Sequence, residues 1–206
     1  RPAWGATFVS DIAPFELMKL RLLNGAHSTM SYLGYLAGRE TIAACMGDDA
    51  LAGLVAYLMH REVTSTLPVP PGADIESYKA ALLRRFRNPA LKHRTWQIAM
   101  DGSQKLPQRL LGTIRDRLRA GAPIDALALG VAAWTRYVTG IDEKGNAIDV
   151  RDPLSADLRA RADVLMLMCY NGSWTEEDLS KMSEEASSSM EINHFLTGSG
   201  GPISNP

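Results

Sequence analysis

The sequence predicts an all-α domain, a multi-helix bundle with at most one small β-hairpin. Three observations support this fold class. Apolar residues recur at helical spacing along most of the chain, aspartates and prolines stand where helices can begin, and proline- and glycine-rich breaks separate the segments. With 206 residues, the chain is long enough to bury one sizeable core.

The first two predicted helices occupy the N-terminal third of the chain. Asp11 and Pro14 mark the start of the first, because proline suits a first helical turn and aspartate complements the helix dipole. Its apolar pattern continues to residues 38–39. The second helix covers Asp48 to about Thr66, and the proline-rich segment 68–72 stops it.

A third helix follows Asp74, which has the right chemistry for an N-cap, and Asn88–Pro89 ends it. The spacing predicts an amphipathic element with apolar side chains on one face and basic side chains elsewhere. The apolar face comprises Tyr78, Leu82, Leu83 and Phe86, and the basic residues are Lys79, Arg84, Arg85 and Arg87.

Two further helices flank a break at Asp101–Gly102, and Ser103 is the predicted N-cap of the second. Residues 124–139 are apolar nearly all round, which predicts a buried helix. A turn at the centre of residues 141–148 predicts the small hairpin, and residues 7–9 compete as another strand. Near the C-terminus we expect an acidic helix within residues 173–190 and fraying over 198–206.

Bulk properties exclude several functional classes. The net charge of -1 indicates neither a nucleic-acid partner nor an anionic membrane surface. The longest apolar run, residues 126–134, is shorter than the roughly 20 residues that span a bilayer. The N-terminal residues lack the features of a signal peptide. Cys45 and Cys169 lie far apart among apolar neighbours, so we expect reduced thiols and a cytoplasmic protein.

Three polar residues in the first helix carry the chemical signal: Lys19, Asn24 and His27. On a regular α-helix of about 100° per residue, His27 lies at about 80° and Asn24 at about 140° from Lys19. All three then fall within one half of a largely apolar helix. A partly buried lysine can act as a general base, an amide N–H can hold a developing alkoxide, and an imidazole can bind a substrate oxygen.

A purely structural interpretation explains the same residues. Lys19 can extend to solvent, Asn24 can prepare a helix break at Gly25, and His27 can be a core histidine with satisfied hydrogen bonds. No zinc site is expected, because His27 lacks a second ligand at suitable spacing on this helix. Spacing alone leaves both interpretations open.

Several blocks of sequence resemble the mannitol dehydrogenase family of long-chain polyol dehydrogenases, in the family's order. Residues 15–28 resemble its K-x4-N-x2-H signature. Residues 88–109 resemble a second block, and their sequence is most similar to the fructuronate reductase (D-mannonate oxidoreductase) branch of the family. Residues 127–137, 142–146 and 152–154 fit as well. The resemblance covers roughly residues 1–158. It implies a helical domain like the C-terminal domain of 6-phosphogluconate dehydrogenase.

The resemblance also implies a function. The chain is expected to hold a helical substrate and catalytic domain over residues 1–165, followed by a divergent tail over 166–206. Lys19 is then the metal-free general acid/base, Asn24 an oxyanion contact and His27 a substrate-orienting group. The reaction is the NAD- or NADP-dependent interconversion of a secondary alcohol and its ketone in an open-chain sugar acid or polyol, with D-mannonate and D-fructuronate favoured.

Residues of the second block are expected near the distal end of the substrate. By resemblance, Gln97 and Lys105 occupy such positions, and Lys105 is the first candidate for a substrate carboxylate, with Arg94 and Arg109 in reserve. Each of the three cations is otherwise a solvated surface residue. We expect His93 to serve in capping or packing.

The family pairs this domain with a preceding Rossmann domain, and no G-x-G-x-x-G fingerprint opens a helix in this chain. The dinucleotide is therefore expected to bind mainly to that other domain. Two alternatives remain: an enzyme for mannitol, tagaturonate or another polyol, and a catalytically incomplete helical binding module.

Overall fold

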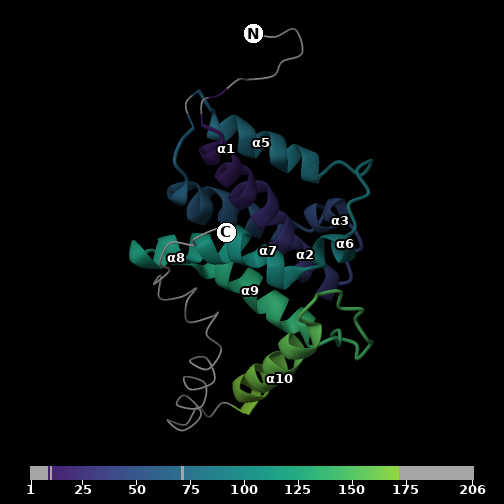
Figure 1. Ribbon diagram of the computed structural model, residues 1–206. Coiled ribbons are helices and arrows are strands. Elements are labelled where there is room, and N and C mark those ends of the chain that lie inside the picture. The colour runs from purple at the N-terminus through teal and green to yellow at the C-terminus, as the bar shows by residue number, and fades with distance from the viewer. Residues whose placement is uncertain (1–8, 10, 71, 172–206) are drawn as a thin grey trace, which may run out of the picture. The chain divides into compact units, whose positions relative to one another are not determined.

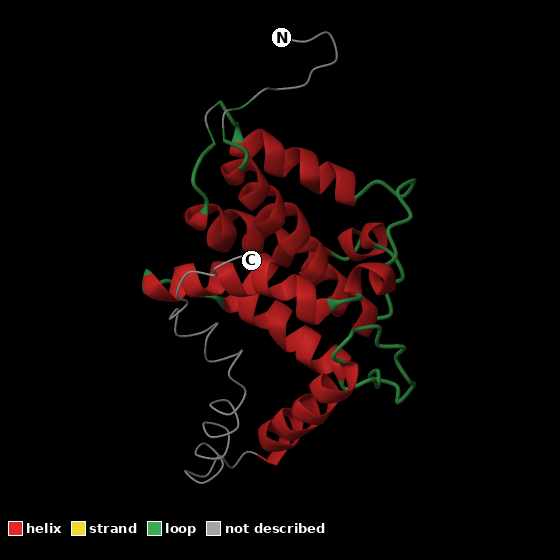
Figure 2. Cartoon of the chain, viewed as in Figure 1, coloured by secondary structure: helices red, strands yellow, loops and turns green. Residues whose placement is uncertain are grey.

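The computed structural model describes residues 9, 11–70 and 72–171, with the backbone alone over 164–171. This part of the chain is helical and contains no strand, only two isolated β-bridges, Thr41–Arg94 and Ile141–Ala147 (Figure 2). The predicted all-α class is confirmed. The hairpin expected over 141–148 is reduced to one bridge, because Asp142 closes a tight turn by accepting hydrogen bonds from the backbone of Lys144 and Asn146.

The first predicted helix is continuous but not uniform. It comprises α1 (Ala13–Met18), a π-helical segment η1 (Lys19–Gly25) and α2 (Ala26–Leu36). It begins as predicted: Asp11 accepts a hydrogen bond from the backbone N–H of Ala13 at 2.9 Å, and Pro14 occupies the first turn. The π-helical segment was not predicted.

The second predicted helix is confirmed and is preceded by a short one that was not predicted, α3 (Ile42–Met46). It consists of α4 (Asp49–Tyr57), the π-helical η2 (Leu58–Val63) and a 3-10 turn, η3 (Thr64–Thr66). Asp48 caps α4 by accepting from the backbone N–H groups of Ala50 and Leu51. An N-cap aspartate satisfies donors that the first turn would otherwise leave unpaired.

The amphipathic helix α5 (Ile75–Phe86) forms as predicted, with the Asp74 side chain as its N-cap. The prediction was wrong for Lys79, which is buried rather than on the polar side of the helix. Its ammonium donates to Thr64 Oγ1 at 3.2 Å and to Glu76 at 2.7 Å. A lysine can be buried when its long stem packs and its charge is paired.

The break at Asp101 is also confirmed, with a different cap. It separates α6 (Thr95–Ala99) from α7 (Gly102–Leu106), which continues through η4 (Pro107–Leu111) into α8 (Gly112–Arg119). Asp101, in the left-handed conformation at φ 56°, is the N-cap residue, so the prediction of Ser103 as cap was wrong. Ser103 lies inside the first turn and donates to Asp152 through its backbone N–H and its hydroxyl.

Helix α9 (Asp125–Val138) buries one face only. The expectation of a helix buried all round was wrong, since Leu129 is 45% exposed and Ala128 and Ala132 are exposed too. Its N-terminus is held by Glu62, a fully buried carboxylate that accepts from the backbone N–H groups of Ala126 and Leu127, both at 2.8 Å.

Helix α2 is the centre of the packing, in contact with α9, α6, α3 and α4 (Figure 1). At the α2–α9 crossing, the rings of Tyr32 and Tyr137 lie 5.4 Å apart, and Gly130 lets the backbones approach beside Thr29. Most buried side chains of this core are apolar, and Cys45 is a buried free thiol. The predicted helix is therefore both the centre of the core and the carrier of the candidate residues.

The chain divides into two compact units, residues 1–160 and 161–206, and α10 (Ser155–Asn171) spans the boundary. The strand expected at residues 7–9 and the features expected over 173–190 and 198–206 lie outside the described residues, apart from the exposed, non-strand Val9. Among the described helices, none combines the length and apolarity needed to cross a membrane.

Candidate active site

Lys19 and Asn24 lie on the π-helical segment η1, where Lys19 is exposed and Asn24 is half-buried. The segment is anchored on its other side by Arg21. This buried arginine forms an ion pair with Asp116 at 2.6 Å and donates to the Thr66 carbonyl at 3.1 Å. Within the described residues, neither the Lys19 nor the Asn24 side chain has a hydrogen-bond or ion-pair partner. Both are free to meet a ligand.

The π-helical geometry changes the relative placement of these residues. Hydrogen bonds in a π-helix run from residue i to i+5, so each residue advances by less than the 100° of an α-helix. Asn24, five positions after Lys19, therefore returns close to the same side, and the 140° expected for a regular helix is too large. Single π-helical turns inside α-helices are frequent at functional sites.

Two of the structural explanations for this cluster are contradicted. Asn24 does not prepare a helix break, because Gly25 has helical angles of φ -62° and ψ -50° and the helix continues through it. The hydrogen bonds of His27 are not satisfied within the part of the chain that the structure describes, because its buried Nε2 atom has no partner there. The explanation of Lys19 as a solvated residue fits its exposure.

The His27 imidazole lies in a compact basic environment. Its ring centroid is 4.7 Å from that of Phe86 and 5.7 Å from that of His93, which packs edge-on against it. Burial lowers the pKa of His27 to about 4, and nearby basic groups add to the effect: His93, Arg85 and Arg109. At neutral pH the imidazole is therefore uncharged and can either donate or accept a hydrogen bond.

Arg109 lies beside His27, brought there by the contact of η4 with η1. The backbones approach so closely that a Cβ on Gly25 would lie 2.9 Å from the Arg109 carbonyl oxygen. The guanidinium donates from Nη1 to Ser28 Oγ at 3.1 Å, whereas its buried Nε has no partner. Burial lowers the pKa of Arg109.

Lys105 and Gln97 have different surroundings. The Lys105 ammonium donates to the Met100 carbonyl at 2.6 Å and lies 3.5 Å from Asp101, so its charge is already paired within its own turn. Gln97 on α6 is exposed. These contacts make Lys105 a weaker candidate for a substrate carboxylate than its position in the sequence indicates.

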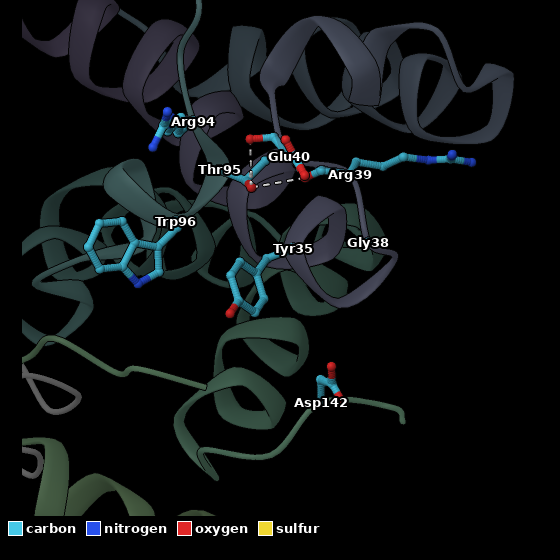
Figure 3. Close-up of a pocket in the computed structure, with 8 residues that line it drawn as sticks. All are labelled: Tyr35, Gly38, Arg39, Glu40, Arg94, Thr95, Trp96 and Asp142. Atoms are coloured by element: carbon cyan, nitrogen blue, oxygen red, sulfur yellow. Dashed lines mark hydrogen bonds between the residues drawn. The ribbon is translucent and has the colours of Figure 1, made fainter. Parts of the chain in front are cut away.

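Arg94 lies apart from the cluster, in a pocket of about 560 Å³ around the C-terminal end of α2 (Figure 3). Tyr35 lines this pocket, and the 16 residues between Lys19 and Tyr35 correspond to roughly 20 Å of helix. Aromatic and polar side chains surround the space, and Figure 3 shows Arg39 extending away from it. The lining residues are Tyr35, Gly38, Arg39, Glu40, Arg94, Thr95, Trp96 and Asp142.

The structure thus joins His27 with Arg109 and leaves Arg94 elsewhere. Sequence reasoning gave no substrate-side role to Ser28 or His93, which touch Arg109 and His27 respectively. His93 does pack, as expected, but against the candidate histidine itself. Their positions in the sequence could have identified them, because Ser28 belongs to the first family-like block and His93 to the second.

The described side chains offer no site for a metal ion or for a dinucleotide. No cluster of three or more His, Cys, Asp or Glu side chains suited to a metal ion occurs in the part of the chain that the structure describes. Nor do the described residues form a parallel sheet with a glycine-rich turn, the usual cradle for a dinucleotide. No reaction step through a bound dinucleotide can therefore be derived from the described residues.

Comparison with known proteins identifies the family of this chain. The family model described as mannitol dehydrogenase C-terminal domain matches residues 11–166. D-Mannonate oxidoreductase of Escherichia coli strain K12 is 55% identical over 162 residues, which cover 77% of this chain and 33% of that protein. Mannitol dehydrogenase 2 of Saccharomyces cerevisiae is 43% identical over 166 residues, covering 79% and 33%.

A solved structure shows the same fold. Pseudomonas fluorescens mannitol 2-dehydrogenase, in a ternary complex with NAD and D-mannitol, matches with a TM-score of 0.74 and 30% identity, over 96% of this chain and 43% of that one. The chain spans about a third of the length of the curated relatives it matches. The resemblance inferred from the sequence blocks is confirmed, and the chain belongs to the mannitol dehydrogenase family, whose C-terminal domain it carries.

Proposed function

We propose that this chain is the substrate-side domain of a nicotinamide-dependent dehydrogenase that interconverts D-mannonate and D-fructuronate in the cytoplasm. The observation that carries the proposal is the uncharged imidazole of His27, which has no hydrogen-bond partner at Nε2 among the described residues and lies about one helical turn beyond Asn24 and two turns beyond the exposed Lys19. A buried polar atom without a partner is uncommon in native proteins and calls for a partner from outside the protein, such as a water molecule or a ligand. Homology to D-mannonate oxidoreductase favours an acidic sugar as that ligand.

Each of the three residues has a distinct task in this proposal. After a side-chain rotation that opens Nε2, His27 hydrogen-bonds a substrate hydroxyl and orients the carbon that reacts. The Asn24 amide donates to the same oxygen and stabilises negative charge as it develops. Lys19 takes the hydroxyl proton during oxidation and returns it during reduction.

The cofactor supplies the hydride acceptor, NAD or NADP, and in this proposal it is held mainly by a Rossmann domain that these residues do not include. Residues 1–165 then act as the substrate and catalytic domain, and 166–206 as a divergent extension. A surface that covers the exposed Lys19 would also remove it from water, which favours the uncharged amine that a general base needs.

The decisive experiment fuses the chain behind the nicotinamide-binding domain of E. coli D-mannonate oxidoreductase and follows NADH formation with D-mannonate. Lys19→Ala should lower kcat by at least about a hundredfold, the usual contribution of a positioned general base. Lys144→Ala, which removes an exposed lysine from the 142–146 turn, is the matched control and should retain the rate. Equal rates for the two variants, or no turnover by the parent fusion, would refute the proposal.

The same fusion tests the alternative substrates. Mannitol dehydrogenases are among the relatives, so kcat/KM for D-mannitol is measured beside that for D-mannonate. We expect the acidic sugar to be preferred, because a site built to pair a carboxylate leaves its own charge unpaired with a neutral polyol. A preference for D-mannitol would instead assign the chain to the polyol branch.

A further inference from the structure

Arg109 differs from the arginines that build this fold. Arg21 pairs with Asp116, and Arg117 donates to three acceptors, the carbonyls of Pro123 and Arg61 and the Ser65 hydroxyl. Arg109 forms no ion pair with any described residue, although it is half-buried; its Nε, like that of Arg21, is enclosed without an acceptor among the described residues, so the missing anionic partner is what sets Arg109 apart. A guanidinium withdrawn from water normally has an anionic partner or a full set of acceptors.

Among the described residues, the ionisable group that acts on this guanidinium is the Tyr32 phenol, and burial raises the pKa of Tyr32, so the phenol is uncharged at neutral pH and supplies no anion. The charged and ionisable groups that act on the neighbouring His27 are all basic: Arg109, Arg85 and His93. Such a concentration of positive charge in a partly dehydrated place attracts an anion. Of the other candidate cations in the second sequence block, Lys105 is paired with Asp101, and Arg94 lines the pocket beside Tyr35.

On this geometry we propose that Arg109, oriented by Ser28, binds the carboxylate of the sugar-acid substrate and so sets the preference for a sugar acid over a neutral polyol. The inference rests on the proposed function, because it places the substrate's reacting carbon at Lys19, Asn24 and His27. Arg109 is then the specificity residue at the substrate's other end.

The contact with Ser28 explains how the guanidinium is aimed. Nη1 is held by the Ser28 hydroxyl at 3.1 Å, which restricts rotation of the guanidinium plane. Nε belongs to the side-on edge through which arginine binds a carboxylate with two parallel hydrogen bonds. In this structure the Nε atom on that edge is buried, so carboxylate binding requires a small shift of the Arg109 side chain. Ser28 immediately follows His27, so the residue that orients Arg109 and the residue proposed to orient the reacting carbon lie in one helical turn.

The test is an equilibrium titration of the 206-residue chain with D-mannonate and with D-mannitol, followed by chemical-shift changes in NMR spectra. Arg109→Met should lower the affinity for D-mannonate by about tenfold or more, as expected for a lost charged hydrogen-bonded contact, and leave that for D-mannitol unchanged. Ser28→Ala, which keeps the guanidinium but frees it, should give a smaller loss with the same selectivity. Arg119→Met removes an exposed arginine at the end of α8 and should change neither affinity.

Two results would overturn the inference: a parent chain that does not bind D-mannonate more tightly than D-mannitol, and an Arg109→Met chain that keeps the parent's preference. The Lys105→Met variant tests the rival assignment. If it selectively loses affinity for D-mannonate while Arg109→Met keeps the parent's affinity, the carboxylate is assigned to Lys105. If Arg109→Met does not fold, as judged by circular dichroism, Ser28→Ala decides by the same criterion.

Turnover by the fused enzyme separates this inference from the proposed function. An active fusion whose Arg109→Met variant keeps the parent's ratio of kcat/KM for D-mannonate and D-mannitol refutes the role of Arg109 alone. An inactive fusion made from a chain that still binds D-mannonate through Arg109 refutes the dehydrogenase proposal alone. An unchanged KM for NAD in Arg109→Met excludes the cofactor phosphates as the anion that Arg109 binds, and a raised one overturns the assignment to substrate.

Discussion

At the scale of single residues, the surroundings of His27 matter more than its position in the signature. A histidine in water is partly protonated near neutral pH, and its charge then opposes burial. Here Phe86 and His93 enclose the ring, and neighbouring positive charges further disfavour the imidazolium. The result is an uncharged ring whose Nε2 has no partner among the described residues, which is the form that suits contact with a substrate hydroxyl.

This environment makes the stability of the domain depend on pH. Below about pH 6.5 the unfolded chain takes up a proton at His27, whereas the folded chain does not until about pH 4. The free energy of unfolding should therefore fall as the pH drops from 6.5 towards 4, by on the order of 3 kcal/mol from this residue, with little further change from it below pH 4. Urea titrations at pH 7 and pH 5 measure the effect.

Removal of the imidazole should remove that part of the pH dependence. His27→Asn is expected to reduce the difference between the two pH values, whatever its effect on absolute stability. His60→Asn is the matched control because His60 is exposed, with Glu76 3.6 Å away, and that variant should keep the parent's pH dependence. An unchanged pH dependence in His27→Asn would contradict the buried neutral state.

At the scale of elements, η1 determines how the candidate residues are presented. Arg21 ties one side of this π-helical segment to α8 and η3, and Gly25 allows η4 to approach the other side. The Lys19 and Asn24 side chains form no hydrogen bond or ion pair with a described residue. In the proposed active site, the anchored side of the segment would hold these two residues in place.

A pair of helical glycines tests the importance of this approach. Gly25→Ala should destabilise the domain by about 1–3 kcal/mol, because the new methyl group would meet the Arg109 backbone oxygen at 2.9 Å and force η1 and η4 apart. Gly53→Ala, in α4 with no atom within 4 Å of the added carbon, should stabilise it by about 0.5–1 kcal/mol. Thermal unfolding monitored by circular dichroism compares them, and similar shifts for both would show that the contact is not restrictive.

At the scale of the whole molecule, the described core belongs almost entirely to the unit of residues 1–160. Ala162 is the only described buried apolar residue beyond it. This unit has its own central helix, α2, and buried polar links such as Glu62 to α9. The family match ends at residue 166, close to the same point.

The core predicts how the domain responds to shortening. A chain that ends after Asn171 keeps the whole described core, so we expect it to unfold cooperatively in guanidinium, with a slope that follows the surface this core buries on folding. Comparison of the two denaturation curves at equal protein concentration measures this. A lower midpoint or a shallower slope for the shortened chain would show that residues 172–206 contribute to the cooperative core.

The sequence by itself determined the helical class, most helix starts and the family. Those features depend on short stretches of sequence. Asp48 and Asp74 cap helices because their side chains reach the N–H groups of the first turn, and the family was identified from several blocks that occur in the family's order. Only the tertiary structure decided that η1 is π-helical and that Lys79 is buried. It also decided that Arg109, unlike Lys105, forms no ion pair with a described residue. Burial and pairing of charge depend on neighbours that are distant in sequence, such as Ser28 for Arg109, and no local pattern specifies them.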